Sequence, residues 1–173
     1  KTAAVTGAAI GAIGYEAARG IALKYPDVEL YVLVRDLDKG NAVKAEIERE
    51  FPKSSVVVIE LDLADLKNIK PAADKLVSNL QGKPLDLLIN CAGIMACPFA
   101  TTKQGYEMQL GVNHLAHVAL TQVLLPYLRK SPNKGGGRVV NLSSLAAYGS
   151  EFNFIFSEDF KKYMSSPNSY QRW

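Results

Sequence analysis

The sequence predicts a doubly wound α/β fold, in which helices cover both faces of a parallel β-sheet. Short apolar stretches alternate five times with helical patterns, and no internal repeat or linker interrupts the series. The stretch 29–34 is almost continuously apolar, as is typical of a strand that is covered on both faces. A turn with Gly7, Gly11 and Gly14 follows the first strand and leads directly into a helix.

Apolar periods and flanking breakers place the individual elements. The first strand spans residues 3–6, and the helix over 14–24 ends before Pro26. We expect Asp38 to cap the second helix, which stops before Pro52. The other expected elements are strands over 29–34, 55–61, 85–90 and 138–142, helices over 65–80 and 104–130, an interruption of the latter around 111–113, and an ordered insertion over 150–167.

Composition limits the class of the protein. The 173 residues are 48% hydrophobic and 21% charged with a net charge of +3, which fits a single globular domain over 1–173. Lysine and arginine form no block and no aromatic stripe accompanies them, so we expect no nucleic-acid partner. No apolar run approaches the roughly 18 residues of a membrane span, and no signal-peptide pattern is visible.

The cysteines indicate the compartment. Cys91 and Cys97 are too few for a disulfide framework and lie too far apart for a Cys-x-x-Cys motif. We therefore expect a reducing, intracellular location, in the cytoplasm or in an organelle lumen or stroma, and an anchor outside these residues stays open. Cys91 is expected to be a small buried hydrophobe and Cys97 an inert thiol, with a reactive thiol as the alternative for Cys97.

The glycine-rich turn predicts a phosphate-binding site. Glycines let the backbone approach an anion closely, and the first N–H groups and the dipole of the following helix point toward it. After the second strand, Val34 occupies the place of the carboxylate that usually selects NAD, and Arg35 follows it. An arginine there suits the 2′-phosphate of NADP, although Arg35 could also be only a solvated strand end beside Asp36.

Polar or small residues also follow the other strands, at the edge of the sheet where ligands bind in such folds. They are Asp62 and Leu63 after the third strand, Asn90 to Gly93 after the fourth, and Ser143 and Ser144 after the fifth. Their recurrence at one edge favours a ligand site over a set of unrelated strand ends.

Taken together, these motifs resemble the short-chain dehydrogenase/reductase family, and most of all its retinol-dehydrogenase-like branch. The matching segments, in the family's order, are 6–8 with Gly11 and Gly14, 34–36, 62–63, 90–95, 97–99, 111–115, 138–144 and 169–170. The resemblance implies a Rossmann-like, dinucleotide-binding sheet of strand order 3-2-1-4-5, which the family continues with two further strands that are missing here. It also implies hydride transfer to or from a carbonyl or an alcohol.

The resemblance further implies a catalytic set. Ser144 matches the serine that hydrogen-bonds the substrate oxygen, Tyr170 the tyrosine that exchanges its proton, and Asn113 the asparagine that holds a relay water. The residues implied in cofactor binding are Thr6, Gly7, Gly11, Ile13, Gly14, Arg35, Asp62, Leu63, Asn90, Ala92 and Gly93. Tyr148 and Tyr163 are rivals for the tyrosine, but neither is followed by a lysine four residues later.

Two features depart from the family's pattern. The family places a lysine four residues after its tyrosine, and this sequence ends at Trp173, one residue earlier. One residue is also inserted between Gly11 and Gly14, so the loop bulges or Ala12 takes part of a glycine's place. We expect the 173-residue chain alone to be catalytically inactive, and marginally stable or self-associating through its fifth strand.

The function that the sequence favours is that of an NADP(H)-dependent oxidoreductase acting on a hydroxyl or carbonyl of an apolar, retinoid- or lipid-like small molecule. The alternative is a non-catalytic dinucleotide-binding sensor or scaffold. His114 and His117 have a spacing that could hold zinc, but without a third ligand we expect packing or capping groups and no metal. The long apolar helix is expected to be mostly core, with a subunit contact in a homo-oligomer as the alternative.

Overall fold

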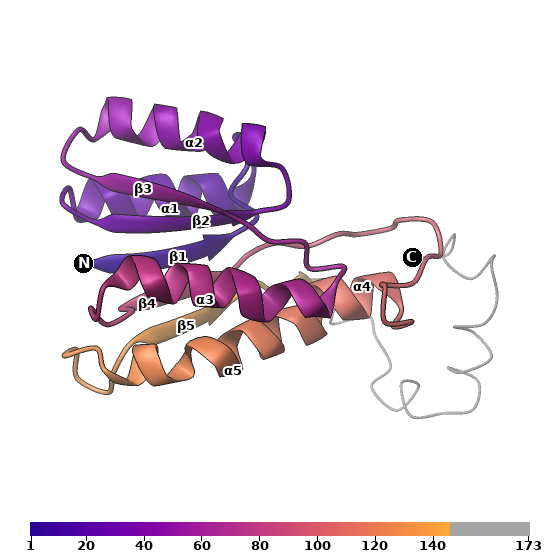
Figure 1. The fold of residues 1–173 in the computed structure, drawn as a ribbon. Helices are drawn as coiled ribbons and strands as arrows, with labels where there is room; N and C mark the ends of the chain where they lie inside the picture. The colour runs from indigo at the N-terminus through magenta and orange to yellow at the C-terminus, as the bar shows by residue number, and fades with distance from the viewer. Residues whose placement is uncertain (146–173) are drawn as a thin grey trace.

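Five parallel strands form one sheet in the order β3-β2-β1-β4-β5 (Figure 1). The structure, a computed structural model, describes residues 1–145. The strands are β1 (Thr2–Thr6), β2 (Glu29–Val34), β3 (Ser55–Glu60), β4 (Leu87–Asn90) and β5 (Arg138–Asn141). The predicted doubly wound sheet and its strand order are therefore confirmed, while the predicted insertion over 150–167 and Tyr148, Tyr163 and Tyr170 lie outside the described residues.

Helices cover both faces of the sheet (Figure 1). On one face lie α1 (Ile13–Lys24) and α2 (Leu37–Glu50), and on the other lie α3 (Ile69–Leu80) and α5 (Ala116–Arg129). Short helical turns precede the last two: a 3₁₀ turn, η1 (Leu66–Asn68), then α4 (Met108–Leu110) and a π-helical turn, η2 (Gly111–Leu115). Along residues 1–145, no helix combines the length and the apolar character needed to cross a membrane.

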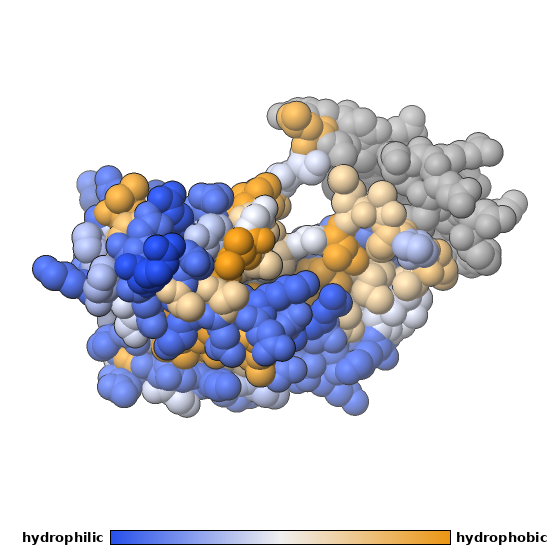
Figure 2. Space-filling view, turned by 90° about the horizontal axis from the view of Figure 1, so that it is seen from above, coloured by the Kyte–Doolittle hydropathy of each residue, from blue (hydrophilic) through white to orange (hydrophobic). Residues whose placement is uncertain are grey.

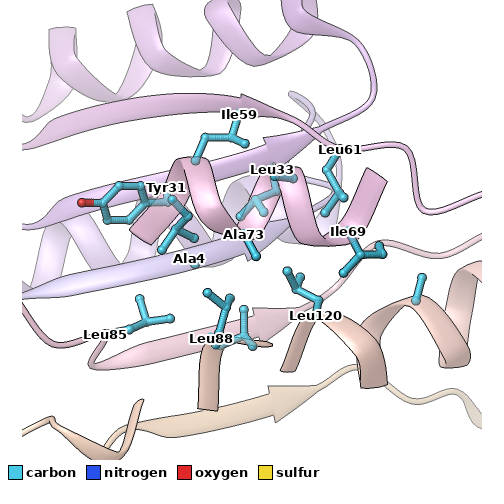
Figure 3. Close-up of a cluster of buried hydrophobic side chains, with 14 of the residues drawn as sticks. Ala4, Tyr31, Leu33, Ile59, Leu61, Ile69, Ala73, Leu85, Leu88 and Leu120 are labelled. Carbon is cyan, nitrogen blue, oxygen red and sulfur yellow. The ribbon is translucent and has the colours of Figure 1, made fainter. Parts of the chain in front are cut away.

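The strand β2 shows why its sequence is apolar throughout. Successive side chains of a strand point to opposite faces of the sheet. Leu30 and Val32 accordingly pack in the cluster beneath α1 and α2, while Tyr31 and Leu33 belong to the cluster beneath α3 and α5. Figure 3 shows part of the second cluster, in which Tyr31 and Leu33 of the sheet lie near Ala73 of α3.

The predicted cap of the second helix and the predicted start of the long helix are wrong, for local reasons. Asp36, not Asp38, caps α2, because its Oδ1 accepts hydrogen bonds from the backbone N–H groups of Asp38 (3.0 Å) and Lys39 (3.2 Å). The long helix begins at Met108 and not at residue 104, because the carboxylate of Glu107 accepts from the N–H groups of Gln109 and Leu110. The predicted interruption around 111–113 is confirmed as the π-helical turn η2.

The strand β5 differs from the other strands in its exposure. It lies at one edge of the sheet, and all four of its residues are exposed. The strand β1, at the centre of the sheet, is in contrast buried throughout. Among the strands, β3, β2, β1 and β4 therefore supply the buried hydrophobic residues of the described core, and β5 supplies none.

Two helical glycines provide a matched test of the packing. A Cβ on Gly40 of α2 would clash with Val58 and lie 2.7 Å from Cγ2 of Val34, whereas a Cβ on Gly20 of α1 would meet nothing within 4 Å. We expect Gly20→Ala to raise the free energy of unfolding by about 0.5–1 kcal/mol through helix propensity. Gly40→Ala should lower it by about 1–2 kcal/mol, because overpacking outweighs that gain. Urea denaturation compares the two, and equal stability of both variants would contradict the described packing of α2.

Candidate functional site

A cavity of about 610 Å³ lies at the carboxyl ends of the central strands. Six of the residues predicted to bind a cofactor line it: Gly7, Arg35, Asp62, Leu63, Ala92 and Gly93. They come from the ends of β1, β2, β3 and β4, which the parallel topology brings to one edge of the sheet. Figure 2 shows apolar side chains around an opening in the middle of the view, within a mostly hydrophilic surface.

The glycine-rich loop is held together by backbone contacts that leave no room for side chains. A Cβ on Gly7 would lie 2.7 Å from Cα of Ala92, and a Cβ on Gly14 would lie 2.8 Å from the carbonyl oxygen of Gly7. Gly7 also has a φ of 70° and donates its N–H to the carbonyl of Leu33 at 3.0 Å. These contacts fix the end of β1, the start of α1 and the residues after β4 against one another.

The residues around the inserted position form a turn that leads into α1. Gly11 has a φ of 84° and open space around its Cα, and the N–H of Ala12 donates to the carbonyl of Ala9 at 2.9 Å. Ala12 is the N-cap of α1 with an extended φ of −93°, so it does not need a glycine's conformational freedom. Gly11, Ile13 and Gly14 lie at the start of α1 and are not among the residues that line the cavity.

Two cations lie at the end of β2. Arg35 lines the cavity, is exposed, and has no hydrogen-bond or ion-pair partner within residues 1–145. Lys39, in the first turn of α2, also lines the cavity, 3.9 Å from the carboxylate of Asp36, which caps that helix. The sequence analysis missed Lys39; the signal was its position one helical turn after Asp36, facing the same edge of the sheet as Arg35.

Thr6 and Asn90, which were also predicted to contact a cofactor, are buried and are not among the residues that line the cavity. Thr6 is fully buried, and its Oγ1 accepts hydrogen bonds from the N–H groups of Cys91 (2.9 Å) and Ala92 (3.0 Å). Asn90 is also buried, and its Nδ2 donates to Oγ1 of Thr121 (3.1 Å) and Oδ1 of Asn141 (2.8 Å). Thr6 thus holds the loop that follows β4, whereas Asn90 ties the end of β4 to α5 and β5.

Asn113 holds the same loop from the opposite side. Its Nδ2 donates to the carbonyl of Ile94 and its Oδ1 accepts from the N–H of Ile94, both at 2.9 Å. Asn113 lies in η2, so the π-helical turn brings its side chain to the loop. Of the predicted catalytic set, Asn113 in η2 and Ser144 after β5 belong to the described residues, whereas Tyr170 lies outside them.

The cysteines and histidines occupy different environments. Cys91 is buried, and this burial raises the pKa of its thiol, as expected for a small buried hydrophobe. Cys97 is partly exposed and lines the cavity. Among residues 1–145, no three His, Cys, Asp or Glu side chains gather in a way that could hold a metal ion, and His117 is instead buried with both ring nitrogens near hydrogen-bonding oxygens.

An anchor around Asp65 fixes the segment that leads to α4. The carboxylate of Asp65 accepts hydrogen bonds from Nε2 of Gln104 (2.7 Å), Nζ of Lys103 (3.0 Å) and the N–H of Lys67 (3.0 Å). The bonds from Gln104 and Lys103 lower the pKa of Asp65 to about 2. No sequence signal pointed to this anchor, because Lys103 and Gln104 follow Asp65 by 38 and 39 residues in the chain.

Comparison with known proteins gives a consistent result. The family described as short chain dehydrogenase matches residues 1–156. Retinol dehydrogenase 11 of Mus musculus is 43% identical over 154 residues, which cover 89% of this chain and 46% of that protein. The chain thus spans about half the length of the curated relatives that it matches.

Solved structures show the same similarity. An uncharacterized protein of Mycobacterium paratuberculosis is 40% identical with a TM-score of 0.68, over 84% of this chain and 47% of that chain. A short chain dehydrogenase of Shigella flexneri in complex with NADP is 28% identical with a TM-score of 0.69, over 87% of this chain and 62% of that chain.

The Asp65 anchor predicts a specific acid sensitivity. Because the pKa of Asp65 in the folded chain lies below its ordinary 3.8, the carboxylate stabilises the fold above that pH. This contribution is lost as the pH falls from about 3.8 toward about 2. We expect Asp65→Asn to be less stable than the unmodified chain at pH 6, and the difference in free energy of unfolding to shrink in acid. Asp74→Asn, on an exposed pair with Lys70, is the control and should show no such convergence; a constant difference for Asp65→Asn would contradict the anchor.

Proposed function

Since the chain belongs to the short chain dehydrogenase family, we propose that it binds NADP(H) and serves hydride transfer between this nucleotide and a hydroxyl or carbonyl of an apolar small molecule. The observation that carries the proposal is the cavity at the carboxyl edge of the sheet, with a glycine cradle at one side and the unpaired Arg35 at another. The relatives named above support the reaction class, and NADP in the Shigella flexneri structure supports the nucleotide class.

The glycine cradle fits a dinucleotide. Gly7 and Gly14 bring the end of β1 and the start of α1 so close that any Cβ would clash. The first N–H groups of a helix lack intrahelical partners, and the helix dipole favours negative charge near them. The loop and the N-terminus of α1 would therefore hold the pyrophosphate. Gly11 and Ile13 are the exposed residues of this loop and helix start.

The end of β2 fits a 2′-phosphate. Val34 offers no carboxylate to the ribose hydroxyls, and the carboxylate of Asp36 is engaged by the N–H groups of α2. Arg35 and Lys39 both line the cavity there, so two cations face the place of an extra phosphate. Charge-assisted hydrogen bonds from such cations are stronger than neutral ones, which favours NADP(H) over NAD(H).

The catalytic roles that we propose follow the family's set. When bound, the nicotinamide would supply or accept the hydride. Ser144 would donate a hydrogen bond to the substrate oxygen, and Tyr170 would give that oxygen a proton or take one from it as its charge changes. Asn113 would hold a relay water; its side chain is engaged with Ile94, so it also orients the cavity wall.

The apolar substrate class rests on two supports. The relatives include retinol dehydrogenases, and the cavity wall contains the apolar side chains of Ile94, Pro98 and Met108. A small alcohol or carbonyl compound with an apolar body would bury that body against such a wall.

The nucleotide preference can be measured by fluorescence titration with NADPH and NADH. We expect tighter binding of NADPH, and a loss of NADPH affinity of about 10- to 100-fold in Arg35→Ala, because a charge-assisted hydrogen bond is removed. Lys39→Ala should lower NADPH affinity less, and neither change should alter NADH binding. Lys53→Ala, which removes the same charge between α2 and β3 at the opposite edge of the sheet, is the control. Equal affinity of the unmodified chain for both nucleotides would overturn the NADP(H) preference.

The catalytic set can be tested in a chain that continues past Trp173 and includes the family's lysine. Tyr170→Phe should abolish carbonyl reduction while NADPH affinity stays unchanged, because only a proton donor is lost. Ser144→Ala should lower the rate by about 10²-fold, as for the removal of an oxyanion donor. Substantial activity in Tyr170→Phe would show that another group is the acid, whereas nucleotide binding without turnover in the unmodified longer chain would favour a sensor.

A further inference from the structure

His117 lies on α5, one turn after Asn113, and the proposed chemistry does not use it. Its side chain is buried, with an exposed fraction of 5% for the residue. The ring Nε2 lies 2.9 Å from Oγ1 of Thr6, and Nδ1 lies 3.1 Å from the carbonyl oxygen of Asn113. The ring therefore joins the end of β1 to the π-helical turn η2.

The partners of the ring decide where its proton lies. The carbonyl oxygen of Asn113 can only accept, so Nδ1 must carry a hydrogen. Oγ1 of Thr6 already accepts from the N–H groups of Cys91 and Ala92, which uses both of its lone pairs. The hydroxyl hydrogen of Thr6 is then donated to Nε2, and Nε2 must be unprotonated. This geometry selects the neutral ring with its proton on Nδ1.

A charged ring does not fit this arrangement. Protonated Nε2 would point a second donor at a hydroxyl whose lone pairs are in use. Burial is the main cause that lowers the pKa of His117, and the nearby His114 lowers it further, against the opposing effect of the Asn113 carbonyl. His114 is the titratable group that acts on the ring; β1 contributes the Thr6 hydroxyl, and Cys91 packs in the cluster on the opposite face of the sheet.

The same two residues, Thr6 and Asn113, clamp the loop after β4. Thr6 holds the N–H groups of Cys91 and Ala92, and the Asn113 side chain holds both backbone groups of Ile94. Ala92, Gly93 and Ile94 line the large cavity. We propose that His117 is a positioning residue: as the neutral Nδ1–H tautomer it ties Thr6 to Asn113, and through them it fixes the 92–94 wall of the nucleotide site. The inference rests on the proposed function only for what occupies the cavity.

The tautomer can be observed directly in the unmodified 173-residue chain, which contains two histidines. A long-range ¹H–¹⁵N spectrum at pH 7.5 resolves the ring nitrogens, and the spectrum of His117→Gln assigns them. We expect a protonated Nδ1 and an unprotonated Nε2 on His117. The opposite tautomer, or a charged ring at this pH, would overturn the proposal without any reference to a nucleotide.

Two substitutions at His117 each keep one polar group near the position of a ring nitrogen and remove the other. His117→Gln keeps a polar group that can reach Thr6, and His117→Asn keeps an amide N–H near the position of Nδ1. In variants that circular dichroism shows to be folded, we expect faster hydrogen exchange at Cys91, Ala92 and Ile94, and a loss of NADPH affinity of about 3- to 10-fold, equivalent to one lost neutral hydrogen bond. His114→Gln, three residues earlier on the exposed side of η2, should change neither quantity.

The pH dependence distinguishes positioning by the neutral ring from simple packing. Because the pKa of His117 in the folded chain is below its ordinary 6.5, the neutral ring contributes stability above pH 6.5, and this contribution is lost as the pH falls through the folded-state pKa. The free energy of unfolding should therefore decline below about pH 6.5 in the unmodified chain and in His114→Gln, and less in His117→Gln. Unchanged amide exchange and the same pH profile in His117→Gln would overturn the proposal. If the unmodified chain binds no NADPH, the proposed function fails, while the spectrum, the exchange rates and the pH profile still decide the role of His117.

Discussion

The close approach of three backbone segments at Gly7 is the constraint on which the candidate site depends. The carbonyl of Gly7 faces Gly14 at the start of α1, and its Cα faces Ala92 after β4, with no space for a side chain on either glycine. This contact sets the position of the helix N-terminus relative to the loop that walls the cavity. The buried Thr6, one residue earlier, secures the same loop by two hydrogen bonds. The proposed anion site at α1 and the shape of the cavity thus depend on one packing arrangement.

The two hydrophobic clusters make that arrangement rigid. Adjacent residues of β2 belong to opposite clusters, because α1 and α2 pack on one face of the central strands and α3 and α5 pack on the other. At the amino ends of the strands, the carboxylate of Asp86 accepts from the N–H of Thr2 (3.2 Å) and from the Ser131 hydroxyl (2.5 Å), which ties β1, β4 and the end of α5 together. The site at the opposite edge can therefore be formed by loops, because the strands that carry them are fixed at both ends.

The sequence was sufficient for the sheet because strand periods, breakers and the glycine turn are local signals. The continuous apolar run of β2 and the interruption of the long helix were both predicted correctly from such signals. The cap at Asp36 and the start at Met108 were not, since only the folded backbone decides which carboxylate accepts from the first N–H groups of a helix. The Asp65 anchor and the burial of Thr6 escaped prediction for a further reason: their contacts join residues that are far apart in the chain, which a one-dimensional pattern does not record.

The described part of the site is unevenly supported. The strands that precede Gly7, Arg35 and the loop after β4 are largely buried. Ser144, in contrast, follows β5, an edge strand whose four residues are all exposed. Val139 and Val140 are neighbours in that strand, so they point to opposite faces, and both are exposed. Ser144 thus follows a strand that is less buried than the strands that precede Gly7 and Arg35. The candidate nucleotide site therefore depends on the buried strands, and the position of Ser144, the serine of the proposed catalytic set, depends on β5.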